Sequence, residues 1–164
     1  MKTGKAFVAG VVGGLVITLI GVVARAIGMK INVEMMLGTM FGGPSSTGKW
    51  VLGLVLHLIL SGLIALAYAA GFEYVAHRAG AAVGTVFSLV HIILAGVVLG
   101  MIPAIHPLIP EKMAAPGAFM AAMGGAYVAT FVIEHLIYGA IVGWMYGPVA
   151  TVRGHEARAR AQVT

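Results

Sequence analysis

The sequence predicts an all-α integral membrane protein that folds as one bundle of four transmembrane helices. Sixty per cent of its 164 residues are hydrophobic and only 9% are charged, whereas a soluble domain carries roughly 25% charged residues. Four apolar runs are long enough to cross a bilayer, which takes about 20 helical residues. Lipid permits only helices or closed barrels to span it, and alternating strand patterns are scarce in this chain.

The four runs belong to a single predicted domain, residues 1–150, and a polar C-terminal tail covers residues 151–164. The predicted spanning helices lie at about 7–28, 50–72, 80–102 and 117–146. The first run is longer than the apolar core of a signal peptide, which is about 7–15 residues. We therefore expect it to be a spanning helix.

Two of the connections have recognisable features. Asn32 is a typical helix cap, with Glu34 in the first turn after it, and predicts a short helix over residues 33–41 that lies along the membrane interface. The connection 103–116 contains four prolines, so it is not expected to be a regular helix throughout.

The basic residues lie on both predicted faces of the membrane, which indicates anchoring rather than binding of nucleic acid. Six lysines and arginines fall on the face shared by the termini, and four fall on the other: Lys2, Lys5, Arg78, Arg153, Arg158 and Arg160 against Arg25, Lys30, Lys49 and Lys112. The positive-inside rule then predicts cytoplasmic termini. The absence of cysteine excludes disulfides, cysteine zinc sites and iron–sulfur clusters.

Small residues recur at steps of three or four along each run, where they let helix backbones approach closely. The predicted stripes are Gly10, Gly14, Thr18, Gly21 and Arg25; Gly53, His57, Ser61 and Ala65; Gly84, Ser88, His91 and Ala95; and His135, Gly139 and Gly143. All three intramembrane histidines belong to these stripes. We therefore expect them to point into the bundle.

These histidines and Glu134 are the candidate functional residues, because ionisable groups inside a membrane are costly and usually functional. His91 and His135 fall near the middle of antiparallel runs and could meet, whereas His57 lies nearer the outer surface. Glu134 lies about 100° around the helix from His135. Its pairing with Arg25 is uncertain, since that arginine is placed nearer the outer face, and Tyr138 could donate a hydrogen bond to it.

Several interpretations of this group stay open. His57, His91, Glu134 and His135 predict a transition-metal site, with copper favoured among zinc, copper, iron and nickel, or His91 and His135 could hold a haem axially. The same groups could instead form hydrogen bonds that fix helix register, or relay protons. No nucleophile with its base is recognisable, so no catalytic activity of the chain by itself is expected.

Methionines provide a secondary candidate site. Eight of the ten map to the predicted outer half: Met29, Met35, Met36, Met40, Met101, Met113, Met120 and Met123. Thioether and imidazole ligands favour Cu(I), which makes His106, Met35, Met36 and Met40 outer-side candidates. The alternative is that methionine acts as an adaptable packing residue.

Two stretches, residues 32–38 (NVEMMLG) and 135–143 (HLIYGAIVG), give the chain a family resemblance. It resembles small bacterial and archaeal membrane proteins of four helices, classed as domains of unknown function. The resemblance implies the four-helix topology and a multi-pass protein of the prokaryotic cytoplasmic membrane. It implies no activity.

The sequence thus predicts an integral membrane subunit that holds a transition metal or haem for metal handling or electron transfer. Its expected partners are the bilayer and other membrane subunits or further copies of itself. One alternative is an accessory or scaffold subunit without a ligand, whose glycine-rich faces dock on partner helices. The other is a small proton-coupled transporter that uses Glu134 as the carrier group.

Overall fold

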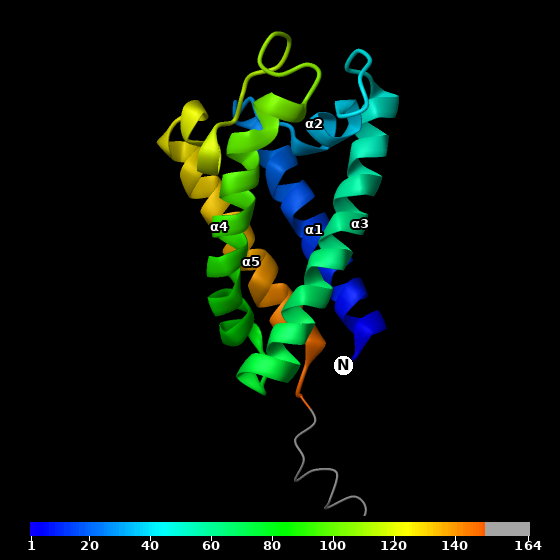
Figure 1. Cartoon of the computed structure of the whole chain (residues 1–164), viewed down its shortest axis with the longest axis vertical. Helices are drawn as coiled ribbons and strands as arrows, with labels where there is room; N and C mark the ends of the chain where they lie inside the picture. Colours follow the sequence, from blue (N-terminus) through cyan, green and yellow to red (C-terminus); the bar gives the residue numbers. More distant parts are fainter. Residues whose placement is uncertain (150–164) are drawn as a thin grey trace, which may run out of the picture.

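The computed structural model describes residues 1–149, and all regular structure in this range is helical. Four helices are long and apolar enough to cross a membrane: α1 (Thr3–Ala26), α3 (Thr47–Gly71), α4 (Ala81–Ile105) and α5 (Gly125–Tyr146). The N-terminus and the end of α5 lie at the same end of the bundle (Figure 1). The all-α class and the four long apolar helices are thus confirmed, and the predicted tail, 151–164, lies outside the described residues.

The last helix begins at Gly125 rather than at residue 117. Before it, Ala118–Met123 form a 3₁₀ segment, η2, in which Phe119 and Met120 have left-handed backbone angles, with φ of 54° and 62°. Gly124 follows with φ of 111°. Positive φ values interrupt the α-helical hydrogen-bond ladder, so the apolar run contains a turn and a helix rather than one helix.

The other long helices differ from the predicted ranges by a few residues at their ends. α1 starts earlier than predicted and stops before Gly28, whose φ is 105°. Ser46 caps α3 by accepting a hydrogen bond from the Lys49 N–H at 3.3 Å, and a π-helical turn, η1 (Phe72–Ala76), follows this helix. α4 continues through Pro103 to Ile105, because this proline falls in the last turn of the helix.

The predicted short helix is present as α2 (Val33–Thr39), and the Asn32 cap is confirmed: its side-chain oxygen accepts from the Met35 N–H at 2.9 Å. α2 packs tightly against α3 across the end of the bundle (Figure 1). A Cβ atom on Gly38 or Gly53 would overlap the backbone of the other helix. The helix is therefore built into the bundle, with Glu34 buried beneath it.

The predicted small-residue stripes lie at the contacts of two helix pairs. α1 packs on α3 where Gly10 meets the Ser61 carbonyl and Ala65, and α4 packs on α5 where Gly84 meets the backbone of Gly139. Any Cβ atom at Gly10 or Gly84 would overlap the facing helix. These contacts lie within the chain, so the close-packing faces are used to assemble the bundle itself.

The two pairs are joined mainly between α1 and α5, and α3 shares few contacts with α4 although a short turn connects them. Tyr138 from α5 lies against Gly13 of α1 and donates a hydrogen bond to the Ser61 carbonyl oxygen of α3. Phe87 of α4 fills the space over Gly71 of α3. Tyr138 is therefore the side chain that ties three helices together at the centre.

Candidate functional site

His91 and His135 meet inside the bundle, as the sequence predicts. The close contact of Gly84 with Gly139 sets the register of α4 and α5, and it brings the two imidazoles to a ring-centroid distance of 4.6 Å with an edge-to-face angle of 71°. Phe131, one turn before His135, packs on its ring at 4.3 Å. Both histidines are half-buried.

Each imidazole of this pair has a hydrogen-bond partner. The His135 Nδ1 atom lies 2.7 Å from the Phe131 carbonyl oxygen, which can only accept, so Nδ1 carries the proton and Nε2 is left as an acceptor. The His91 Nδ1 atom lies 3.2 Å from the Tyr68 hydroxyl of α3. The Tyr68 bond joins α3 to α4, and the contact between the two imidazole rings joins α4 to α5.

Tyr138 packs beside this pair but does not bind Glu134 as expected. Its ring lies 5.5 Å from that of His91 and 5.7 Å from that of Tyr68. Its hydroxyl is directed across the bundle to the Ser61 carbonyl of α3. Glu134 lies one helical turn before Tyr138, only about 40° around α5, but the single hydroxyl proton of Tyr138 is already donated to Ser61.

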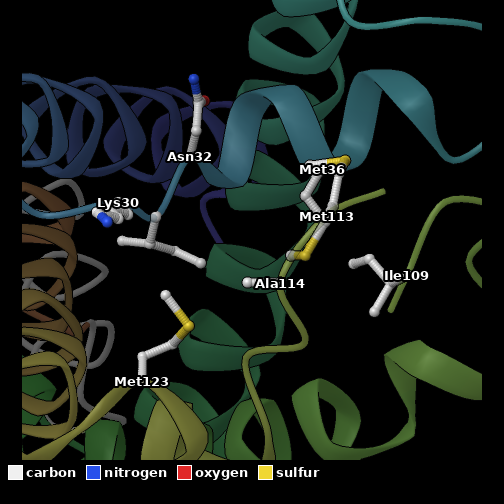
Figure 2. A pocket seen from close by; sticks show the side chains of 8 residues that line it. Lys30, Asn32, Met36, Ile109, Met113, Ala114 and Met123 are labelled. Carbon is white, nitrogen blue, oxygen red and sulfur yellow. The ribbon is translucent and has the colours of Figure 1, made fainter. Parts of the chain in front are cut away.

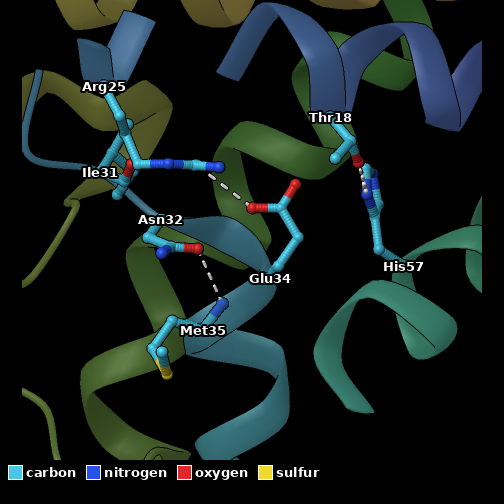
Figure 3. Close-up of polar contacts among 7 residues, drawn as sticks. All are labelled: Thr18, Arg25, Ile31, Asn32, Glu34, Met35 and His57. Atoms are coloured by element: carbon cyan, nitrogen blue, oxygen red, sulfur yellow. Dashed lines mark hydrogen bonds and ion pairs between the residues drawn. The ribbon is translucent and has the colours of Figure 1, made fainter. Parts of the chain in front are cut away.

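His57 binds a residue of α1 instead of joining the other two histidines. Its Nδ1 atom lies 3.1 Å from the Thr18 hydroxyl, and both residues belong to the predicted stripes of α3 and α1 (Figure 3). It is near enough to Glu34 and to His135 for electrostatic interaction. His57 thus lies between the histidine pair and the α2 end of the bundle.

An ion pair that was not predicted joins α1 to α2 at the α2 end of the bundle. Arg25 of α1 donates to the Glu34 carboxylate of α2 at 3.3 Å and to the Ile31 carbonyl at 3.5 Å (Figure 3). Only 3% of the Glu34 side chain is exposed. Within residues 1–149 this is the only ion pair. The Asn32 cap was the available indication, because it starts α2 at a point that turns Glu34 toward α1.

Glu134 is not part of the Arg25–Glu34 ion pair. Its carboxylate is near enough to both Arg25 and Glu34 for electrostatic interaction, yet it forms neither a hydrogen bond nor an ion pair in the part of the chain that the structure describes. The side chain is half-buried. The possible Arg25–Glu134 pairing is therefore not formed, because α2 brings a second carboxylate to the arginine.

The predicted metal site is not assembled by these residues. Over the described range, no group of three or more histidine, aspartate or glutamate side chains is placed to hold a metal ion. His57 and Glu134 each lie apart from the histidine pair, since His57 binds Thr18 and Glu134 lies on another face of α5. His57, His91, Glu134 and His135 do not fit a metal centre.

The histidine pair does not fit a haem either. Axial ligation by His91 and His135 would require the macrocycle to lie between the two imidazoles. The rings are instead in direct edge-to-face contact, with centroids 4.6 Å apart. Glycines that could have left room for a ring, such as Gly84 and Gly139, are filled by the facing helix.

His106 and the outer-side methionines occupy a separate place. His106 is buried, its Nε2 atom lies 2.9 Å from the Met36 carbonyl and its Nδ1 atom accepts from the Leu108 N–H at 3.1 Å. Both ring nitrogens are therefore in use. Met36 and Met40 pack in the same apolar cluster near Ile109, and Met35 contributes backbone groups to the Asn32 cap and to Thr39.

Comparison with known proteins finds no match among family models, curated proteins or solved structures. The resemblance of residues 32–38 and 135–143 to small four-helix membrane proteins stays a prediction.

Proposed function

We propose that the chain is a small proton-coupled transporter of the prokaryotic cytoplasmic membrane, with both termini in the cytoplasm and Glu134 as the carrier group. The apolar outer surface of the long helices supports membrane insertion. Leu19, Val86 and Leu94 each expose more than 60% of their surface, and lipid is the solvent in which such side chains are stable. Insertion makes the interior ionisable groups costly, and groups retained at such cost usually serve ion or proton movement.

The observation that carries the proposal is the position of Glu134. A carboxylate that is half-buried among apolar helices and has no partner within residues 1–149 gains little from remaining charged, so it can take up and release a proton at modest cost. The charges of Arg25 and Glu34 act on it, but it is bonded to neither. A structural carboxylate would be expected to have a fixed partner, as Glu34 has.

Further ionisable groups continue from Glu134 toward the centre of the bundle. We call Arg25, Glu34, Glu134, His57, His135, His91 and Tyr68 the interior polar row. His57 is bonded to Thr18 and feels the charge of Glu34, His135 contacts His91, and His91 is bonded to Tyr68. Histidine can both accept and donate a proton through its two nitrogens, so we propose that the row, with water in its gaps, passes protons to and from Glu134.

The two rival functions have less support from the geometry. The residues offered for a metal or haem do not fit one, as described above. A scaffold that docks through glycine-rich faces would need those faces free, but Gly10, Gly14, Gly84 and Gly139 contact the facing helix of the same chain. Neither rival function explains why the residues of the interior polar row are present.

Proton flux into liposomes containing the purified protein tests the proposal. A potassium gradient with valinomycin imposes an inward driving force, and an enclosed pH-sensitive dye reports acidification. We expect a protein-dependent flux that falls at least tenfold in Glu134→Gln and is unchanged in Glu111→Gln, which alters an exposed loop carboxylate. Proton flux that is equal in Glu134→Gln and in the unaltered chain would refute the proposal.

A further inference from the structure

A pocket of about 150 Å³ opens at the α2 end of the bundle and is lined by three methionines (Figure 2). Met36 comes from α2, Met113 from the connection between α4 and η2, and Met123 from the end of η2. The fold therefore brings three thioethers from distant parts of the sequence to one hollow. The remaining lining is Lys30, Ile31, Asn32, Ile109 and Ala114.

The hollow distinguishes this cluster from ordinary methionine packing. Methionine used as an adaptable packing residue fills irregular gaps, but these three surround a space much larger than the roughly 10–15 Å³ of probe volume that one water needs. Met113 is also held in place, with its sulfur 3.6 Å from the Thr39 hydroxyl. Met36 and Met113 thus pack in an apolar cluster with Ile102 and Ile109 and also contribute to the pocket wall.

The sulfurs of Met36 and Met123 have no hydrogen-bond partner within residues 1–149, whereas the Met113 sulfur accepts from the Thr39 hydroxyl. The Asn32 side-chain oxygen already accepts from the Met35 N–H. His106, which contacts the Met36 backbone from behind, has both ring nitrogens engaged. Lys30 also belongs to the lining.

We infer that this pocket binds a monovalent soft metal ion, Cu(I), through the sulfurs of Met36, Met113 and Met123. Thioethers select Cu(I), whereas zinc, nickel and harder ions favour imidazole, thiolate or carboxylate ligands, and the pocket lining contains none of these. Each methionine side chain has three rotatable bonds, which lets the sulfurs close on an ion that enters from the open side. The site is separate from the interior polar row and does not depend on the proposed proton transport.

Anaerobic titration of the detergent-purified protein with Cu(I), in competition with a chromophoric Cu(I) chelator, tests this site. We expect one Cu(I) per chain with sulfur ligands in its X-ray absorption spectrum. Replacing all three methionines by leucine, which preserves apolar volume, is expected to abolish binding, and Met113→Leu alone to weaken it at least tenfold. Met101→Leu, an exposed methionine of α4 outside the pocket, is the matched control and should bind as the unaltered chain does.

Three results would overturn the inference. The first is the absence of binding in competition with the chelator by protein with an unchanged helical circular dichroism spectrum. The second is undiminished binding by the triple leucine variant. The third is Cu(I) binding that survives in the triple variant and disappears in His91→Ala with His135→Ala, which would assign the metal to the histidine pair.

Discussion

Arg25 directs its guanidinium to Glu34, at 3.3 Å, and within residues 1–149 Glu134 has no ion-pair partner. The first carboxylate is almost fully buried and bound, whereas the second is half-buried and has no hydrogen bond in the same range. The ion pair joins α1 to α2 and leaves Glu134 outside it. We propose that Glu34 has a structural role and Glu134 a functional one.

Replacing Arg25 tests the structural role of the Arg25–Glu34 ion pair. In Arg25→Gln the Glu34 carboxylate stays buried without its ion pair, and breaking a buried pair on one side costs about 3–5 kcal/mol. We expect a loss of about 3 kcal/mol in the free energy of unfolding, measured by titration of mixed micelles with SDS. The double variant Arg25→Gln with Glu34→Gln should recover most of that loss. A double variant as unstable as Arg25→Gln would show that the pair itself is not the cause.

The close contact between α4 and α5 predicts a strict requirement for glycine at position 84. A Cβ atom there would overlap the Gly139 carbonyl, and overpacking of this kind costs about 1–3 kcal/mol. Gly84→Ala should therefore unfold at a lower SDS fraction. Gly4→Ala is the control, because nothing lies within 4 Å of the added methyl group. Equal stabilities of the two variants would contradict the packing described for these helices.

The hydrogen bond between Tyr68 and His91 can be removed with little change in shape. Tyr68→Phe keeps the aromatic contacts with Phe72, Phe87 and Tyr138 and deletes only the hydroxyl. We expect a loss of about 1 kcal/mol in stability, as is typical of one hydrogen bond, and a change in the ¹⁵N chemical shift of the His91 Nδ1 atom. An unchanged His91 spectrum would show that the bond is absent in the membrane.

The contact between His91 and His135 can be tested by replacing both histidines with cysteines and measuring whether the two thiols form a disulfide. Because the chain has no cysteine, His91→Cys with His135→Cys introduces the only two thiols. Their side chains start from positions whose rings touch, so mild oxidation should protect both thiols from maleimide labelling. His57→Cys with His135→Cys should stay reactive, since His57 binds Thr18. Protection of the control pair and not of the first pair would reverse the assignment of neighbours.

Periodicity in the sequence was sufficient to predict the packing faces of the helices and the histidine contact. Small residues at steps of three or four determine which face of a helix can approach another backbone, so the stripes through Gly10 and Gly84 identified the packing faces. His91 and His135 lie on such stripes at similar depths in antiparallel helices. The contact between the two histidines follows from the small-residue pattern of α4 and α5 and from the fact that these helices follow one another in the chain.

The features that the sequence did not reveal depend on segments without periodicity. Depth counted along the helices could not show that α2 folds back to bring Glu34 to Arg25. The break at Phe119 and Met120 comes from backbone angles that apolar composition does not indicate. The methionine pocket likewise requires the path of the connection between α4 and η2, and only Met36 of its three methionines was among the predicted site residues.

We propose that Glu134 exchanges its proton inside the assembled bundle. Infrared difference spectroscopy of the protein in lipid membranes, recorded as the bulk pH is stepped, measures this exchange through the carbonyl stretching band of the protonated carboxyl group. We expect a reversible band that shifts in D₂O, is absent in Glu134→Gln and is present in Glu111→Gln. A set of bands that is identical in Glu134→Gln and the unaltered protein would show that Glu134 does not exchange its proton.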